Sequence, residues 1–219
     1  MTVKAKAFSL VRRGKREVIL TAIGFNGGNN LFKWQLAYSR TLDKGLISKV
    51  LYFPNQDAWL EKFPGLRKLS ITSDQIRFTD RRATYMGAAQ GVDYTPQERA
   101  RFIKDVLLTS DGFKQSLERA QAFVRDDDLV INVRRGDYYN SRFEPEFGIN
   151  IVEYVRQALA KQLALGPVGR VVLVSDNVPW CVDNLTHLAP QLEFVVNENR
   201  RDMFDDLAVL ACAKRLILA

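Results

Sequence analysis

The sequence of 219 residues contains one histidine, two cysteines and no apolar run of the roughly 20 residues that cross a membrane. A lone histidine, His187, argues against a multi-histidine zinc site and a histidine-based catalytic triad. Cys181 and Cys212 lie far apart without metal-ligand spacing, so we expect reduced thiols in a reducing compartment. The basic segment 1–16 precedes only a short apolar stretch, and we predict no signal peptide and a cytoplasmic protein.

The net charge of +7 is concentrated in the first half of the chain. Residues 126–219 hold 10 Lys and Arg against 14 Asp and Glu, so residues 1–125 carry +11. A basic half can bind an anionic polymer, nucleic acid or the inner face of an anionic membrane, although a solvated surface is the commoner explanation. No nucleic-acid-binding motif accompanies the charge, so we expect no nucleic-acid partner.

Apolar segments in the first half predict a strand, a helix and a second strand. The run 18–23 predicts a strand, and apolar residues along one side of 31–45 predict a helix. Pro54 should end a second strand at 50–53.

The rest of the first half is less regular. We expect 57–79 to hold a short helix and a strand pair. Thr95-Pro96-Gln97-Glu98 has the residues of a helix N-terminus, with Thr95 as N-cap. The helical pattern continues to Phe123 with a break near 110–112.

The second half alternates strands and helices with short connections, which predicts a parallel sheet with helices on both faces. Asp126-Asp127-Asp128 precedes the first of these strands, so we predict two α/β domains, 1–125 and 126–219. In chain order the expected elements are strand 129–133, helix 151–165, strand 170–174, helix 179–188, strand 192–196, helix 203–213 and strand 215–218.

Polar residues follow two of these predicted strands. Arg134, Arg135 and Gly136 come after the apolar run 129–133, at a carboxyl end where open α/β sheets bind ligands. Arginine offers planar, bidentate donors that suit phosphate oxygens, so the pair predicts a diphosphate site; alternatively it is surface charge closing a strand. Ser175-Asp176 follows the strand 170–174, and Asp176 is expected either to accept hydrogen bonds from a ribose or base or to cap the next helix.

A glycine-rich loop, 24–30, connects the first predicted strand to its helix. It lacks the spacing of a dinucleotide fingerprint or a Walker motif. Its place before a helix could let backbone N–H groups meet an anion, although such a loop often serves only as a turn.

Five segments, in order, resemble the α-1,2-fucosyltransferase family (glycosyltransferase family 11). The family's Gly-Asn-Gln-Leu-Phe and His-x-Arg-Arg-Gly-Asp-Tyr motifs correspond to the first two segments here. The segments are Gly28-Asn29-Asn30-Leu31-Phe32, Asn132-Val133-Arg134-Arg135-Gly136-Asp137-Tyr138, Phe147-Gly148-Ile149 with Glu153-Tyr154, Ser175-Asp176 with Trp180-Cys181 and Asn184-Leu185, and Asp206-Leu207 with Cys212 and Lys214.

The resemblance implies a GT-B-like fold of two Rossmann-like domains, with the donor GDP-β-L-fucose held mainly by the second. It implies inverting, metal-independent transfer of L-fucose to a hydroxyl of a glycan or oligosaccharide acceptor, with no cofactor. Arg134, Arg135 and Asn29 would act in catalysis. The substrate-binding residues would be Gly28, Asn30, Asn132, Gly136, Asp137, Tyr138, Ser175 and Asp176.

Two departures from the family pattern leave alternatives open. Asn132 stands where the family has histidine, and the sequence stops at Ala219, before the family's final loop and helices. We therefore expect an incomplete second domain, in a fragment or a degenerate member. The alternatives to a fucosyltransferase are a non-catalytic GDP or nucleotide-sugar-binding protein and a basic module that binds an anionic polymer.

Overall fold

The computed structural model describes residues 16–20, 28–85, 94–136, 139, 141 and 144–219 of the chain. The chain divides into two compact units, Met1–Phe113 and Lys114–Ala219, and each is described here by itself. This division falls inside helix α5 (Asp111–Phe123), whereas the domain boundary predicted after residue 125 follows the helix.

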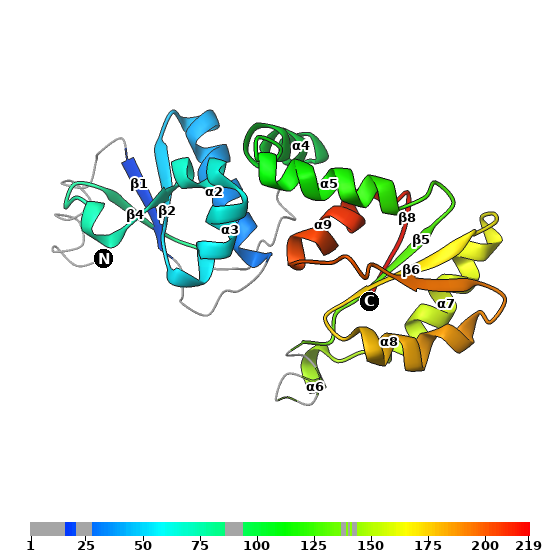
Figure 1. Cartoon of the computed structure of the whole chain (residues 1–219). Helices are drawn as coiled ribbons and strands as arrows, with labels where there is room; N and C mark the ends of the chain where they lie inside the picture. Colours follow the sequence, from blue (N-terminus) through cyan, green and yellow to red (C-terminus); the bar gives the residue numbers. More distant parts are fainter. Residues whose placement is uncertain (1–15, 21–27, 86–93, 137–138, 140, 142–143) are drawn as a thin grey trace. The chain divides into compact units, whose positions relative to one another are not determined.

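The first unit is built on a parallel four-stranded sheet in the order β3-β2-β1-β4 (Figure 1). Its strands and helices are β1 (Arg16–Leu20), α2 (Asn29–Lys44), β2 (Ile47–Leu51), α3 (Asp57–Lys62), β3 (Ser70–Ile71), β4 (Arg81–Thr84) and α4 (Pro96–Phe102). Short 3-10 segments occupy Pro54–Gln56, Pro64–Leu69 and Ser73–Gln75, and a π-helical turn occupies Ile103–Leu107.

Three predictions for this unit need correction, and strand pairing explains them. β1 begins at Arg16, before the predicted run, whose residues 21–23 lie outside the described part of the chain. β2 begins at Ile47 because its backbone pairs with that of β1 from Arg16 onward. Strand pairing, rather than side-chain polarity, therefore sets this bound. The short β3 pairs in parallel with β2, so 57–79 contains no strand pair of its own.

The predicted ends of two helices are confirmed. Gly45 takes a left-handed φ of 58° after α2, a conformation that glycine adopts without strain. Thr95 caps α4 through a capping box, in which its hydroxyl accepts from the Glu98 N–H at 3.2 Å and its own N–H donates to the Glu98 carboxylate at 2.7 Å.

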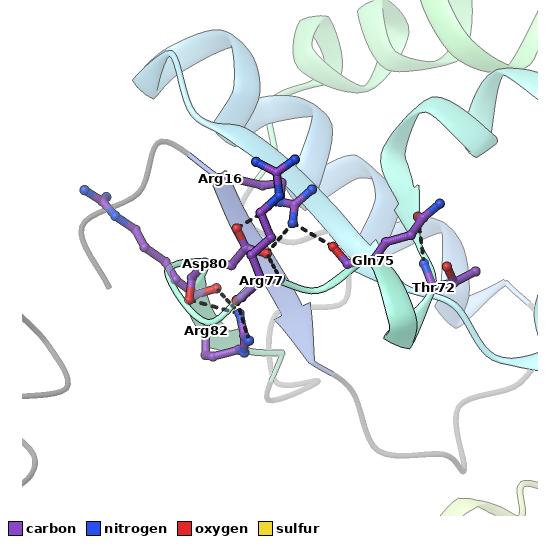
Figure 2. A network of polar contacts seen from close by, with 7 residues as sticks. Arg16, Thr72, Gln75, Arg77, Asp80 and Arg82 are labelled. Carbon is purple, nitrogen blue, oxygen red and sulfur yellow. Dashed lines mark hydrogen bonds and ion pairs between the residues drawn. The ribbon is translucent and has the colours of Figure 1, made fainter. Parts of the chain in front are cut away.

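Some of the basic residues of the first unit hold the sheet together. Asp80, which is buried, accepts two hydrogen bonds from the Arg16 guanidinium, at 2.9 and 2.5 Å, and one from the Arg77 N–H at 2.7 Å (Figure 2). Arg82 donates to the backbone carbonyls of Asp80 and Arg77. These bonds join the start of β1 to the turn before β4, so part of the positive charge has a structural role.

The second unit is built on another parallel sheet, in the order β7-β6-β5-β8. Besides α5, its elements are β5 (Leu129–Val133), α6 (Glu144–Phe147), α7 (Ile151–Ala164), β6 (Arg170–Ser175), α8 (Val178–Leu185) with the 3-10 turn Thr186–Leu188, β7 (Glu193–Val196), α9 (Met203–Cys212) and β8 (Arg215–Leu218). The prediction of α/β architecture with parallel sheets is confirmed.

Helices cover both faces of the second sheet, as predicted. Figure 1 shows α7 and α8 on one face and α5 and α9 on the other. Alternate residues of each strand serve the two faces. Leu129, Ile131 and Val133 of β5 pack in one buried cluster with residues of α7 and α8. On the opposite side, Arg119 of α5 pairs with Asp205 of α9 at 2.6 Å.

Two further features concern the lengths of the helices and the state of the cysteines. No helix in the described ranges is both long and apolar enough to span a membrane. Both cysteines are free thiols; Cys181 is buried, and its burial raises the pKa of the thiol.

Candidate functional site

The second sheet has a point where its strand order reverses. β5 lies between β6, which follows it in sequence, and β8, the last strand. In open parallel sheets, the carboxyl ends of the strands beside such a point form a ligand crevice. Arg134 and Arg135 follow β5, and Asp176 follows β6, so the sequence places charged residues at this edge.

A hydrogen bond joins the residues that follow β5 and β6. The Arg135 N–H donates to Asp176 Oδ1 at 2.9 Å. Gly136 has a φ of 30°, and a Cβ added there would lie 2.9 Å from Asp176 Oδ2. Residues that carry a side chain rarely adopt that φ. The backbone conformation and the close approach of Asp176 therefore both require glycine.

Two aromatic rings hold the Arg135 guanidinium. Its Cζ atom lies 4.0 Å from the centroid of the Trp180 ring and 4.8 Å from that of Tyr139. Both distances are within the range of cation–π attraction. These two contacts position the Arg135 guanidinium, whose N–H groups are suited to binding an anion.

Arg135, Gly136, Tyr139, Asp176 and Asn177 line a cavity of about 230 Å³. The lining of this cavity therefore includes a cation, a carboxylate, an amide and an aromatic ring. A larger cavity of about 430 Å³ in the same unit, lined by residues of α5 and of the loop after β7, shares no lining residue with it. We take the smaller cavity as the candidate site because its lining residues follow β5 and β6, at the carboxyl edge of the parallel sheet where such folds bind ligands.

The hypothesis that Asp176 caps the next helix is wrong. Asn177 caps α8, with its Oδ1 accepting from the Trp180 N–H at 3.2 Å. Asp176 instead takes the hydrogen bond from Arg135. Ser175, the last residue of β6, is buried, and its hydroxyl accepts from the Asn177 N–H at 2.9 Å, so it shapes the turn after β6.

The remaining predicted residues of this unit lie around the end of β5. Asn132 is half-buried within β5, and its carbonyl accepts from the Ala219 N–H at 2.9 Å. Arg134 is exposed, and its N–H donates to the Ala219 carbonyl at 3.0 Å. Asp137 and Tyr138 lie outside the described residues.

The predicted residues of the first unit lie at the start of α2. Gly28 precedes the helix and is exposed, Asn29 is its first residue, and Asn30 is 0% exposed. Neither Asn30 Oδ1 nor Nδ2 has a hydrogen-bond partner among the described residues.

Lys33 lies one turn along α2 from Asn30. Lys33 is 1% exposed, and burial lowers the pKa of its amine to about 8. Asn30 and Lys33 are therefore both buried near the start of α2.

Sequence reasoning missed three residues of the cavity region: Tyr139, Asn177 and Trp180. Tyr139 follows the Gly-Asp-Tyr segment directly, and its aromatic character was the available signal. Trp180 was noted only as part of a motif. Its contact with Arg135 depends on how α8 lies against β6, which sequence spacing alone does not give.

Within the described ranges, no group of three or more His, Cys, Asp or Glu side chains is placed to hold a metal ion. Arg135 is a cationic group in the lining of the candidate site. Arginine can bind an anionic oxygen and stabilise negative charge that grows on it during a reaction.

No protein-family model matches the chain, and no curated protein matches its sequence. Two crystal structures of POFUT1 in complex with GDP are similar to it, each with 13% identity. One match has a TM-score of 0.42 and covers 93% of this chain and 66% of POFUT1; the other has a TM-score of 0.39 and covers 75% and 51%. In the latter match, this chain spans about half the length of POFUT1.

Proposed function

We propose that the second unit binds the GDP moiety of a nucleotide sugar, and that the protein transfers L-fucose from GDP-β-L-fucose to a sugar hydroxyl. The observation that carries the proposal is Arg135, held by Trp180 and Tyr139 above a cavity at the carboxyl ends of β5 and β6. A planar cation at this edge of a parallel sheet is suited to a diphosphate.

The proposed reaction is an inverting displacement without a metal ion. The acceptor oxygen forms a bond to the anomeric carbon of fucose while the bond from that carbon to the β-phosphate oxygen breaks. The electron pair of the broken bond stays on GDP, and the acceptor hydroxyl gives its proton to solvent. Arg135, with Arg134 beside it, stabilises the charge that grows on the phosphate. An α-1,2 linkage follows from the sequence resemblance.

The remaining residues of the site would bind and position the donor. Asp176 Oδ1 orients the Arg135 backbone, and the carboxylate lines the cavity, where it can accept from a ribose or guanine donor. Ser175 and Gly136 shape the two turns that carry these groups. Asn132, within β5, offers an amide near the same strand end.

The sequence resemblance also implies a role in substrate binding or catalysis for Gly28, Asn29 and Asn30, at the start of α2. Asn29 and Gly28 offer their backbone and side-chain groups at the same helix end, where partial positive charge favours anionic oxygens. The proposed location is cytoplasmic, with the basic half contacting an anionic membrane surface.

Calorimetric titration with GDP, GTP and ADP tests the donor site. We expect GDP to bind, and Arg135→Ala to weaken binding by at least about tenfold, because the truncation removes a charged partner of phosphate. Arg156→Ala, on the exposed side of α7, is the control that changes net charge equally. If GDP gives neither heat nor thermal stabilisation with the wild-type protein, the proposed function is wrong.

A non-catalytic nucleotide-sugar-binding protein is the alternative, and Asn132 favours it. Asparagine cannot carry the charge of the histidine that it replaces in the family motif. Incubation with GDP-fucose and a panel of oligosaccharides separates the two. Release of GDP together with a fucosylated product supports the enzyme, whereas tight binding without any turnover supports the alternative.

A further inference from the structure

A second cavity lies in the first unit, where β2 and β3 end. Its volume is about 380 Å³, and Tyr52 and Thr72, which line it, directly follow the last residues of these strands. Small-molecule sites range from roughly 300 to 1,000 Å³, so this volume suits one small ligand. The carboxyl ends of parallel strands are also the usual position of a ligand in this class of fold.

Hydrogen bonds hold the walls of this cavity in place. The Tyr52 N–H donates to the Ile71 carbonyl at 2.9 Å, which fixes the two strand ends side by side. Ser70 accepts from the buried Trp34 indole at 2.9 Å and donates to the Leu66 carbonyl at 2.9 Å. The cavity is therefore preformed, which lowers the entropy cost of binding.

The capping box after β3 completes one wall. The Thr72 N–H donates to the Gln75 side-chain oxygen at 3.3 Å, and Figure 2 shows this amide turned toward Thr72. The Gln75 backbone carbonyl is held separately, by the Arg16 guanidinium at 2.8 Å. Both residues line the cavity and can therefore present polar groups in fixed positions.

Asp57 and Arg67 influence the Tyr52 hydroxyl in opposite directions. This hydroxyl donates to Asp57 Oδ1 at 2.7 Å, and the bond raises the pKa of Tyr52, while the positive charge of Arg67 lowers it. Asp57 and Arg67 both line the cavity and are exposed to solvent. A carboxylate and a guanidinium each bind neighbouring hydroxyl groups in a bidentate manner, one as acceptor and the other as donor.

The apolar part of the lining suits the same kind of ligand. Leu60 and Ile71 are buried side chains that contribute to the wall, and the Tyr52 ring adds an aromatic surface. A pyranose has hydroxyl groups around its rim and apolar C–H groups on its faces. It needs polar partners at its edge and an apolar or aromatic surface beside its ring, and this cavity offers both.

We propose that this cavity binds the pyranose residue of the acceptor glycan, with Asp57 and Arg67 as the residues that select its hydroxyl pattern. The assignment rests on the proposed function, because a fucosyltransferase requires such an acceptor. It adds the location and the chemistry of acceptor recognition: a single pyranose ring, bound by charged groups at its hydroxyl edge and by Tyr52 at its face.

The test measures binding of methyl glycosides of galactose, glucose, mannose and N-acetylglucosamine to the full chain by NMR titration. We expect one or more of them to shift resonances of residues that line the cavity. Asp57→Asn and Arg67→Gln should each raise the Kd by about tenfold, since each removes a charged hydrogen-bond partner. Glu61→Gln, on the exposed side of α3, makes the same charge change as Asp57→Asn outside the cavity and should leave the Kd unchanged.

The outcome is independent of the donor site. If no glycoside binds, or if the Asp57 and Arg67 variants bind with the wild-type Kd, the cavity is not the acceptor site, whatever GDP does. If the glycosides bind as expected but GDP does not bind, the proposed function fails, and the cavity stands as a carbohydrate site of another kind. Thermal unfolding of each variant verifies that the fold is retained.

Discussion

The Arg135 N–H donates to Asp176 Oδ1 at 2.9 Å, which joins the turn after β5 to the turn after β6. We expect Asp176→Ala to lower GDP affinity by at least about tenfold, since it releases the backbone that carries the guanidinium. Asp176→Asn keeps an oxygen acceptor in the same position and should retain more affinity than the alanine variant. Equal loss in both variants would mean that the carboxylate charge, rather than this bond, determines affinity; calorimetric titration distinguishes the two.

Gly136→Ala should disturb the same turn. Its φ of 30° and the 2.9 Å approach of Asp176 Oδ2 to an added Cβ both oppose a side chain. We expect a loss of about 1 kcal/mol or more in the free energy of unfolding, together with weaker GDP binding.

Gly112→Ala is the matched control for the glycine substitution. Gly112 lies in α5, where an added Cβ would make only an ordinary contact, 3.9 Å from the Ser110 hydroxyl. Alanine there should leave stability unchanged or raise it by up to about 1 kcal/mol. Chemical denaturation measures both variants, and a Gly136→Ala protein as stable as the wild type would contradict the strain argument.

The contact of Arg135 with Trp180 should govern how well the cation is positioned. Trp180→Ala removes a ring 4.0 Å from the guanidinium, and we expect it to weaken GDP binding by a factor of about 2 to 30, from the roughly 0.5–2 kcal/mol of such contacts. Trp180→Phe keeps an aromatic face and should show a smaller effect. Calorimetry gives the Kd, and an alanine variant with unchanged affinity would mean that Tyr139 alone suffices.

The second sheet shows which features the sequence could predict. β5 and β8 have the predicted bounds because their apolar runs are short and clearly bordered, and β5 is buried on both faces. The bounds of β2 were wrong because pairing with β1, rather than side-chain polarity, sets where it starts. Hydrophobic pattern therefore located central strands better than strands that begin with polar residues.

The candidate site was predictable only in part. The position of Arg135 and Asp176 after two strands follows from the alternation of strands and helices, because parallel strands place their carboxyl ends at one edge. The ring contacts of Arg135 and the cap by Asn177 depend on local backbone geometry and on the placement of α8. The burial of Asn30 and Lys33 likewise could not be predicted from the sequence, because polar residues near a helix start are usually expected to be exposed.

Lys33 should make stability depend on alkaline pH. Burial lowers the pKa of its amine to about 8 from an ordinary value of 10.5. Between these two values the unfolded chain binds more protons than the native protein, so the free energy of unfolding should rise with pH. Below about pH 8 the amine is charged in both states, and this contribution does not change with pH.

Lys33→Met removes the titrating group while keeping a long side chain. The difference in unfolding free energy between wild type and variant should therefore change between pH 8 and 10.5, with the wild type gaining relative to the variant. Urea denaturation at several pH values measures this difference. A constant difference over the range would show that Lys33 titrates at its ordinary pKa.

A buried ion pair should anchor the second unit. Arg170 Nε and a second guanidinium nitrogen donate to the two carboxylate oxygens of Asp128 at 2.8 and 3.0 Å, and these side chains are 9% and 0% exposed. Asp128→Ala leaves a buried cation unpaired and should cost about 3–5 kcal/mol. Breaking the exposed pair of Asp126 with Lys214, whose side chains are 89% and 62% exposed, should cost less than about 1 kcal/mol. Chemical denaturation compares the two alanine variants, and similar losses would contradict a special role for the buried pair.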